Sequence, residues 1–364
     1  MTALAAEIRE RIRRDGPISV ATYMELCLSH PTLGYYRRGE RIGAAGDFIT
    51  APETSQMFGE LIGLWCAAVW RAMGAPARVR LVELGPGRGT LMADALRAAR
   101  TVPAFLKALD LHLVETSESL RAEQRTRLAE ARPAWHERLE TVPPGPLLVV
   151  ANEFFDALPI RQFERIDDDW RERVVALAPS SEAFRFAAAP APCAEAGRLG
   201  HAPTGAIVER APAREALAAA LAARVAAEGG AALIVDYGHA RPGTGDTLQA
   251  LRRHRRHGVL DDPGDADLTA HVDFSALAAA ARRAGAGVFG PVAQGAFLKA
   301  LGIEERAAAL RRNASASQAQ AIDAALRRLT GAHGMGALFK ALAITHPALD
   351  ALPGFEAEPE RAAQ

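Results

Sequence analysis

Three glycines and one acid form the most distinctive chemical pattern in the chain. Residues 83–89 read Glu-Leu-Gly-Pro-Gly-Arg-Gly, so Gly85, Gly87 and Gly89 stand at every second position. Glycines let a ligand approach the backbone closely and accept positive φ angles. A dinucleotide-binding turn has the spacing G-x-G-x-x-G and offers backbone amides to a pyrophosphate, whereas here the spacing differs and Pro86 removes one amide. The pattern therefore predicts a ligand-binding turn for something other than a polyphosphate.

Two glutamates indicate what that ligand is. Glu83 stands two residues before the first glycine, where it would repel an anion and attract an ammonium group such as that of S-adenosylmethionine. Glu115 ends the next predicted strand, where its two carboxylate oxygens can accept hydrogen bonds from both hydroxyls of a ribose. Alone, either acid would be interpreted as a solvent-facing strand end. Both together with the glycine turn predict a cofactor site formed by Glu83, Gly85, Pro86, Gly87, Gly89 and Glu115.

A second group of polar residues follows the apolar stretch 147–151. Asn152, Glu153 and Asp156 would lie at the carboxyl edge of a parallel sheet, where open α/β folds bind ligands. The i, i+3 spacing of the two acids allows both to face one substrate cation, and the phenylalanine pair between them could stack on a guanidinium. We expect Glu153 and Asp156 to be catalytic and Asn152 to contact the cofactor. The alternative is that the phenylalanines are core and Asp156 caps the following turn.

Two further segments supply weaker candidates. Asp47, Phe48 and Thr50 lie in a glycine-containing segment before the predicted helix 53–73, and we expect them to fold across the cofactor. As a bare pattern, this segment is a loop with a helix start that resembles a capping box. His239 follows another buried strand and is a candidate proton acceptor, although a structural histidine is the alternative interpretation.

Composition narrows the classes of function. The 364 residues include 43 Lys and Arg against 43 Asp and Glu, so the formal net charge is +0. A nucleic-acid or membrane-surface partner usually requires a basic excess, and we expect neither. No apolar run reaches the length of a membrane span, the N-terminus lacks the apolar core of a secretion signal, and three cysteines exclude a disulfide framework. We therefore expect a cytoplasmic protein.

No metal site is expected at His254 and His257, because arginines surround these histidines. This basic stretch is a solvated loop or a docking site for an acidic surface of a partner protein.

Apolar strands alternate with helical patterns along much of the chain, which predicts an α/β fold with a mostly parallel sheet. Two stretches interrupt the alternation, and we interpret them as insertions at the rim of the sheet. The expected division is an N-terminal helical or lid segment at 1–75, a core at 76–240 and 270–346, insertions at 160–210, 241–270 and 295–330, and a tail at 347–364.

Residues 83–89 resemble motif I of class I methyltransferases, and further segments resemble one family among them, the MidA-like family. That family includes the mitochondrial arginine methyltransferase of complex I assembly. The segments follow the family order from about residue 17 to residue 346, which is more specific than motif I alone. They are Ser29-His30-Pro31, Gly34-Tyr35-Tyr36, Gly46 to Glu53, Gln56 to Glu60, Asn152 to Pro159, Val235 to His239, Asp267 to Phe274 and Phe297 to Gly302.

The resemblance implies a seven-stranded class I methyltransferase sheet, which is Rossmann-like, and S-adenosylmethionine as the methyl donor. It also implies a protein substrate methylated on arginine, with a complex I subunit as one candidate, and it allows a homodimer. One departure is Ala337-Leu338, where a charged residue is expected, and it puts only a rim contact in doubt. Two alternatives stay open: a non-catalytic assembly factor that retains the fold, and an NAD-dependent oxidoreductase.

Overall fold

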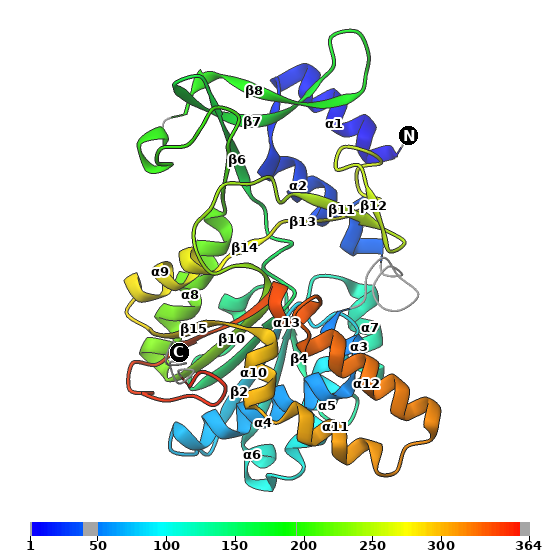
Figure 1. The fold of residues 1–364 in the computed structure, drawn as a ribbon, viewed down its shortest axis with the longest axis vertical. Helices are drawn as coiled ribbons and strands as arrows, with labels where there is room; N and C mark the ends of the chain where they lie inside the picture. Colours follow the sequence, from blue (N-terminus) through cyan, green and yellow to red (C-terminus); the bar gives the residue numbers. More distant parts are fainter. Residues whose placement is uncertain (1, 39–49, 194, 357–364) are drawn as a thin grey trace, which may run out of the picture.

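The computed structural model describes residues 2–38, 50–193 and 195–356. Figure 1 shows two parts stacked along the long axis of the molecule. The larger part contains a sheet covered by helices, and the smaller part contains two antiparallel sheets beside the N-terminal helices. The chain passes between the two parts several times, so neither part is one continuous stretch of sequence.

The large sheet is mostly parallel. Five of its strands, from β4 at one edge to β10, are parallel to one another. The next strand, β16 (Phe339–Thr345), runs antiparallel to both of its neighbours, β10 and β15. A two-residue strand, β14 (Val272–Asp273), pairs with the end of β10. The expected mostly parallel α/β sheet of seven strands is therefore confirmed. In spatial order the strands are β4 (Ala134–His136), β3 (Leu109–Val114), β2 (Val79–Leu84), β5 (Leu147–Asn152), β10 (Gly230–His239), β16 (Phe339–Thr345) and β15 (Gly287–Ala293).

Helices cover both faces of this sheet, which explains why its central strands are apolar at every position. In β5, Leu148 and Val150 belong to the core under α4 (Gln56–Ala72) and α5 (Thr90–Ala99). Leu147 and Val149 belong to the core under α8 (Pro212–Glu228) and α9 (Phe274–Arg283). Each such side chain contributes about 1.5–3 kcal/mol by its burial. The helices of this part are α3 (Ala51–Thr54), α4 (Gln56–Ala72), α5 (Thr90–Ala99), α6 (Pro103–Ala108), α7 (Glu118–Arg127), α8 (Pro212–Glu228), α9 (Phe274–Arg283), α10 (Gln294–Ala300), α11 (Ile303–Arg311), α12 (Ala316–Thr330) and α13 (Met335–Leu338).

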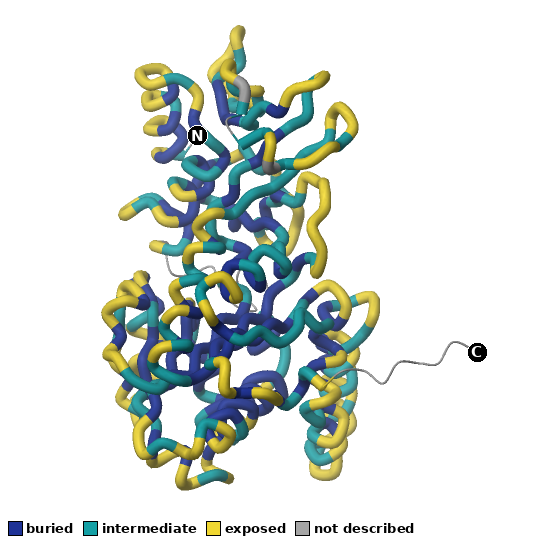
Figure 2. The backbone as a smooth tube through the Cα atoms, turned by 90° about the vertical axis from the view of Figure 1, so that its left-hand side faces the viewer, coloured by how far each residue is buried: buried dark blue, intermediate teal, exposed yellow. Residues whose placement is uncertain are grey.

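The smaller part has its own core, shared between the N-terminal helices and strands that come much later in the chain. Buried backbone continues through both parts (Figure 2). One sheet has the order β1-β7-β6-β9 with β8 also paired to β7, and the other has the order β12-β11-β13. The elements are α1 (Ala3–Asp15), α2 (Val20–Ser29), β1 (Ile18–Ser19), β6 (Arg161–Ile166), β7 (Asp169–Leu177), β8 (Phe184–Pro192), β9 (Ile207–Arg210), β11 (Gln249–Arg252), β12 (Arg255–His257) and β13 (Asp267–Thr269).

Local sequence signals set the ends of the two N-terminal helices. The Thr2 hydroxyl accepts a hydrogen bond from the Ala5 N–H at 3.1 Å, and the Ser19 hydroxyl accepts one from the Thr22 N–H at 3.0 Å. These side chains satisfy amides that have no partner inside the helix. Gly16, with a φ of 87°, ends α1. Both helices therefore begin at local sequence signals.

Residues 1–75, expected as one N-terminal segment, contribute to both parts. α1 and α2 pack in the smaller part, whereas α4 packs against α5 in the larger part. The segments expected as insertions at 160–210 and 241–270 carry the antiparallel sheets, and 295–330 carries α11 and α12. The division into domains remains a prediction. Within the described ranges, no helix is both long enough and apolar enough to cross a membrane.

Candidate active site

A pocket of about 300 Å³ lies at the carboxyl ends of β2, β3 and β5. One wall comes from the large sheet and the loops that follow its strands, and another comes from α2 and the short 3₁₀ helix η1 (Tyr35–Arg38). The pocket brings together most of the residues predicted from the sequence. Those that line it are Thr50, Glu83, Gly85, Pro86, Gly87, Glu115, Asn152 and Glu153.

The glycine turn has the backbone geometry that its composition predicts. Gly85, Gly87 and Gly89 have φ angles of 61°, 52° and 77°, which residues with a side chain rarely adopt. A Cβ atom on Gly85 would lie 2.6 Å from Cδ2 of Phe154, so the turn also needs glycine for space. Gly89 does not line the pocket: it directly precedes α5 and faces Leu128.

Glu83 is a buried acid at the floor of the pocket. Its side chain is 3% exposed, and Oε2 has no hydrogen-bond partner among the described residues. Burial, with a smaller contribution from the nearby Glu115 carboxylate, raises the pKa of Glu83 to about 8. A carboxylate in this position is costly unless a cation or a donor pairs with it. The orphaned oxygen therefore fits a cofactor that carries a positive charge.

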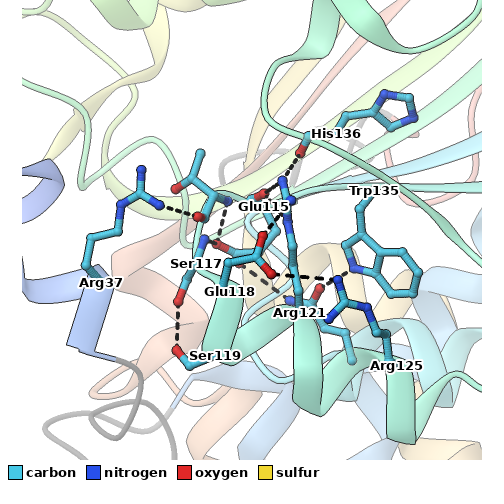
Figure 3. Close-up of polar contacts among 11 residues, drawn as sticks. Arg37, Glu115, Ser117, Glu118, Ser119, Arg121, Arg125, Trp135 and His136 are labelled. Carbon is cyan, nitrogen blue, oxygen red and sulfur yellow. Dashed lines mark hydrogen bonds and ion pairs between the residues drawn. The ribbon is translucent and has the colours of Figure 1, made fainter. Parts of the chain in front are cut away.

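Glu115 is already engaged by the backbone (Figure 3). Oε1 accepts hydrogen bonds from the Thr116 and Ser117 N–H groups, each at 2.8 Å. Among the described residues, the one donor to Oε2 is Nε2 of Gln124, at 3.5 Å, so Oε2 keeps capacity for a further donor. Burial raises the pKa of the Glu115 carboxyl, and the Ser117 N–H opposes this rise. The geometry leaves one oxygen available to a ribose, rather than the two oxygens that the sequence suggested.

Gln124 is a residue that the sequence reasoning missed. It is fully buried in α7, where its Nε2 donates to the Gly87 carbonyl at 2.6 Å and its Oε1 accepts from the indole N–H of Trp135 at 2.8 Å. Through these bonds it connects the glycine turn with β4. A glutamine in the middle of a polar helix gives no signal in a single sequence.

Glu153 has a strained backbone inside the pocket. Its φ is 50°, in the left-handed region, and its N–H donates to the Val235 carbonyl at 2.9 Å. Oε1 accepts from the Ala51 N–H at 2.8 Å and from Nδ2 of Asn152 at 3.1 Å, while Oδ1 of Asn152 has no partner among the described residues. Burial raises the pKa of Glu153 to about 7. Such strain is typical of functional sites, because a surrounding structure must hold it.

Asp156 does not join Glu153 in the pocket, in contrast to the i, i+3 expectation. Residues 153–158 do not form a helical turn, and the Asp156 carboxylate is held by the hydroxyl of Tyr237 instead. Burial raises the pKa of Asp156 to about 6, and the Arg214 guanidinium opposes this rise. The predicted pair of facing acids is therefore separated by the local backbone.

Two buried polar side chains, those of Asp236 and Arg214, fix the loop that carries Glu153. Oδ2 of Asp236 accepts from the Phe155 N–H at 2.9 Å and from the Asp156 N–H at 3.1 Å. Arg214, which is 1% exposed, donates to the carbonyls of Asp156 at 2.8 Å and Leu158 at 3.0 Å. The loop backbone is thus held from both its N–H and its C=O groups, which is a condition for keeping a strained residue in place.

His239 also lies outside the pocket. β10 continues past the carboxyl ends of its neighbours and pairs with β14, so its last residue is carried to another face. There Nδ1 of His239 lies 2.6 Å from the Arg241 carbonyl, and the side chain lines a separate small cavity together with His271.

Of the three candidates expected to fold across the cofactor, Asp47 and Phe48 lie outside the described residues. Thr50 lines the pocket at the start of α3.

The second wall contains residues that no sequence argument singled out as site residues. The Tyr36 hydroxyl donates to Oδ1 of Asp267 at 2.8 Å, which ties η1 to the smaller part. The Arg37 guanidinium donates to the Thr116 carbonyl, which ties the same segment to the loop after β3. Both residues line the pocket. The N-terminal segment therefore closes the pocket from the side of the smaller part.

Comparison with known proteins identifies the family. Residues 61–292 match a family described as "Putative S-adenosyl-L-methionine-dependent methyltransferase". The chain belongs to this family. It is similar to the mitochondrial protein arginine methyltransferase NDUFAF7 of Danio rerio (39% identity over 84% of this chain and 78% of the relative) and of Homo sapiens (39% identity, 84% and 75%). It is also similar to the NDUFAF7 homologue of Drosophila melanogaster (38% identity, 94% and 84%).

A solved structure extends the comparison to the fold and the cofactor. The crystal structure of a Burkholderia thailandensis protein bound to S-adenosyl-homocysteine has 32% identity to this chain, covers 99% of it and 96% of itself, and gives a TM-score of 0.84. The chain is thus an S-adenosylmethionine-dependent methyltransferase, and the oxidoreductase alternative is excluded. The expected cytoplasmic location is wrong by this comparison, because the curated relatives are named as mitochondrial proteins.

Proposed function

We propose that this methyltransferase modifies an arginine side chain of a protein substrate, with a subunit of respiratory complex I as one candidate. The observation that carries the proposal is the charge of the pocket. Five glutamates line it: Glu53, Glu83, Glu115, Glu137 and Glu153. The described cations that line it are Arg37 and Arg88, and Arg88 is paired with Glu123 at 2.8 Å. An acid-rich pocket suits a cationic cofactor beside a cationic substrate. The relatives named as protein arginine methyltransferases support the same choice of substrate.

The cofactor-binding role is proposed for the glycine turn and the acids around it. Gly85, Pro86 and Gly87 would lie against the cofactor, with Glu83 near its positive charge and Oε2 of Glu115 on its ribose. Asn152 and Thr50 would contribute polar contacts from the facing side. When bound, S-adenosylmethionine supplies a methyl group activated by its sulfonium.

The catalytic role is proposed for Glu153. Hydrogen bonds to Oε1 leave Oε2 free of donors from the described residues, so Oε2 can accept one from a substrate guanidinium. A guanidinium that gains a methyl group must lose one N–H proton, or it would carry two positive charges. Glu153, whose burial raises the pKa to about 7, is suited to accept that proton near neutral pH. The Phe154 ring, which also lines the pocket, offers a face for the planar guanidinium.

Glu153→Gln tests this assignment. The amide keeps the volume and an oxygen for the Ala51 N–H but can neither carry the charge nor accept the proton. We expect the cofactor Kd, measured by calorimetry, to stay within about twofold, and methylation to fall about 10²-fold or more, equivalent to about 2.7 kcal/mol. Methylarginine would be measured by mass spectrometry on a protein fraction from a deletion strain. Glu130→Gln is the matched control, because the Glu130 side chain is exposed and paired with Arg100.

The possible outcomes separate the alternatives. Normal methylation by Glu153→Gln would remove Glu153 from catalysis, and loss of cofactor binding would move it to the cofactor site. No methylarginine with the wild-type protein, despite normal cofactor binding, would favour the non-catalytic assembly factor. The complex I subunit and the homodimer remain predictions, the second testable by sedimentation of the purified protein.

A further inference from the structure

The β11–β12 hairpin carries an unusual concentration of positive charge. Residues 252–257 read Arg-Arg-His-Arg-Arg-His in a chain whose overall charge is zero. The four middle residues are exposed, and side chains of the hairpin line an open hollow on the surface. The hollow is lined by Arg252, Arg253, Arg255, Arg256 and His257.

The positive charge of the hairpin is only partly neutralised. Arg252 binds Asp262 at 2.9 Å and approaches Asp265 at 3.9 Å, which fixes the base of the hairpin to the following loop. Arg255 and Arg256 make no ion pair with any residue in the described ranges. Two guanidinium groups are therefore offered to solvent at the rim of the hollow.

The turn of the hairpin keeps charged residues where glycine or asparagine would be easier to accommodate. A two-residue hairpin turn of this type needs positive φ at both central positions, which favours Asn-Gly. Here Arg253 and His254 have φ angles of 51° and 58°. The tight turn places Arg255 directly opposite Arg252 across the two strands. The strain is an independent sign that this hairpin is more than a solvated connection.

A short series of contacts connects the hairpin to the active-site pocket. Tyr36 lines the pocket, and its hydroxyl donates to Asp267 at 2.8 Å. Asp267 pairs with Leu251 in β11, and the basic run begins at the next residue. At the rise of an extended strand, the tip of the hairpin lies about 7–10 Å beyond Leu251. Figure 1 shows the hairpin beside α2, in the smaller part of the molecule.

We infer that this hairpin docks an acidic segment of the protein substrate while the substrate arginine enters the acid-lined pocket. The inference rests on the proposed function, because it assumes a protein substrate. Opposite charges at the two sites would fix the direction in which the substrate lies and reject a segment with the reverse pattern. Recognition by exposed arginines would also raise the association rate and weaken with salt.

The surroundings of the hairpin favour an acidic protein segment over other anionic partners. A membrane surface is normally bound by cations together with an exposed apolar face. Among the described residues, the large exposed apolar side chains are Leu64, Leu106 and Leu338, and all three lie in the larger part. Binding of single-stranded nucleic acid usually adds aromatic side chains for base stacking, and the hairpin has none.

The test compares two labelled peptides by fluorescence anisotropy with the full chain. Each peptide contains one arginine; one has glutamates on both sides of it, and the other has glutamines. We expect wild-type protein to bind the glutamate peptide about tenfold more tightly at about 0.05 M salt, with the preference reduced at about 0.2 M. Arg255→Glu/Arg256→Glu should abolish the preference. Arg282→Glu/Arg312→Glu, which changes the same charge on exposed residues of the larger part, should retain it.

Each result has a defined meaning. Equal binding of both peptides to the wild type, or equal loss in both double variants, would overturn the inference. Binding of phosphatidylglycerol vesicles through Arg255 and Arg256 without a peptide preference would assign the hairpin to a membrane instead. The cofactor Kd, measured on the same samples, should be unchanged in all variants. Peptide docking is measured without turnover, so docking can be observed even if no arginine is methylated. Arginine methylation can likewise be observed even if the hairpin docks no peptide, so the two failures are distinguishable.

Discussion

Glu83→Gln should stabilise the protein relative to the wild type by an amount that grows as the pH rises, although it weakens the cofactor site. Burial raises the pKa of Glu83 from the ordinary glutamate value of 4.5 to about 8. Between these two values the folded protein holds a proton that the unfolded chain releases. The folded state therefore binds more protons, and the free energy of unfolding of the wild type falls as the pH rises through this window. A glutamine at position 83 has no proton to lose, so the variant escapes this fall.

The size of the effect follows from the pKa difference. One pKa unit corresponds to about 1.4 kcal/mol, so the wild type should lose about 3 kcal/mol relative to the variant between pH 5 and pH 7.5. Placing an amide where Oε2 has no partner also changes the free energy of unfolding, but by an amount that does not depend on pH. This constant cancels when the stabilities at two pH values are subtracted. The side chain is 3% exposed, so solvent screening reduces the effect little.

Urea unfolding followed by circular dichroism, without cofactor and at several pH values, measures this difference. The denaturant slope should be equal in both proteins, so that a shift of the midpoint reports stability. Glu130→Gln is again the control, because it makes the same substitution on an exposed side chain. A stability difference for Glu83→Gln that stays level within about 0.5 kcal/mol from pH 5 to pH 7.5 would refute the reasoning.

Three further outcomes follow from the geometry of the pocket and the hairpin. Glu115→Ala should raise the cofactor Kd about tenfold to hundredfold by calorimetry, because a charge-assisted bond contributes about 1.5–3 kcal/mol; an unchanged Kd would remove the ribose assignment. Gly85→Ala should lower the free energy of unfolding by about 1–3 kcal/mol and weaken cofactor binding. The φ of Gly85 is 61°, and a Cβ atom there would contact Phe154. An unchanged urea midpoint would contradict the predicted loss of stability. Arg253→Asn/His254→Gly should raise the free energy of unfolding by about 1–2 kcal/mol by relieving two left-handed residues, and an unchanged or lower midpoint would show that the turn is not strained.

The large sheet was predictable because burial on both faces leaves a clear pattern. The apolar stretch 147–151 forms β5 as expected, and the glycine turn follows β2 as predicted. The short edge strand β4 (Ala134–His136) was missed, because three partly exposed residues carry no periodic signal. β11 and β12 were missed because the Arg253-His254 turn lacks the Asn-Gly signal of a hairpin.

The site was predictable where a side chain directly follows a strand and less so where the chain turns. Glu83, Asn152 and Glu153 reach the pocket because the ends of β2 and β5 fix them. Asp156 and His239 do not, because the rule for strand ends does not foresee a loop held by Arg214 or a strand that continues past its neighbours. The second wall depends on contacts between distant segments, which spacing along one sequence does not encode.

The shared core of the smaller part sets an order of events during synthesis. α1 and α2 are made well before some of their packing partners, which include Leu268 in β13, about 240 residues later. At about 5–20 residues per second, roughly 10–50 s pass before these last partners of the two helices are made. The pocket wall at Leu28 and Tyr36 is therefore among the last features of the molecule to form, although its residues are among the first to be made.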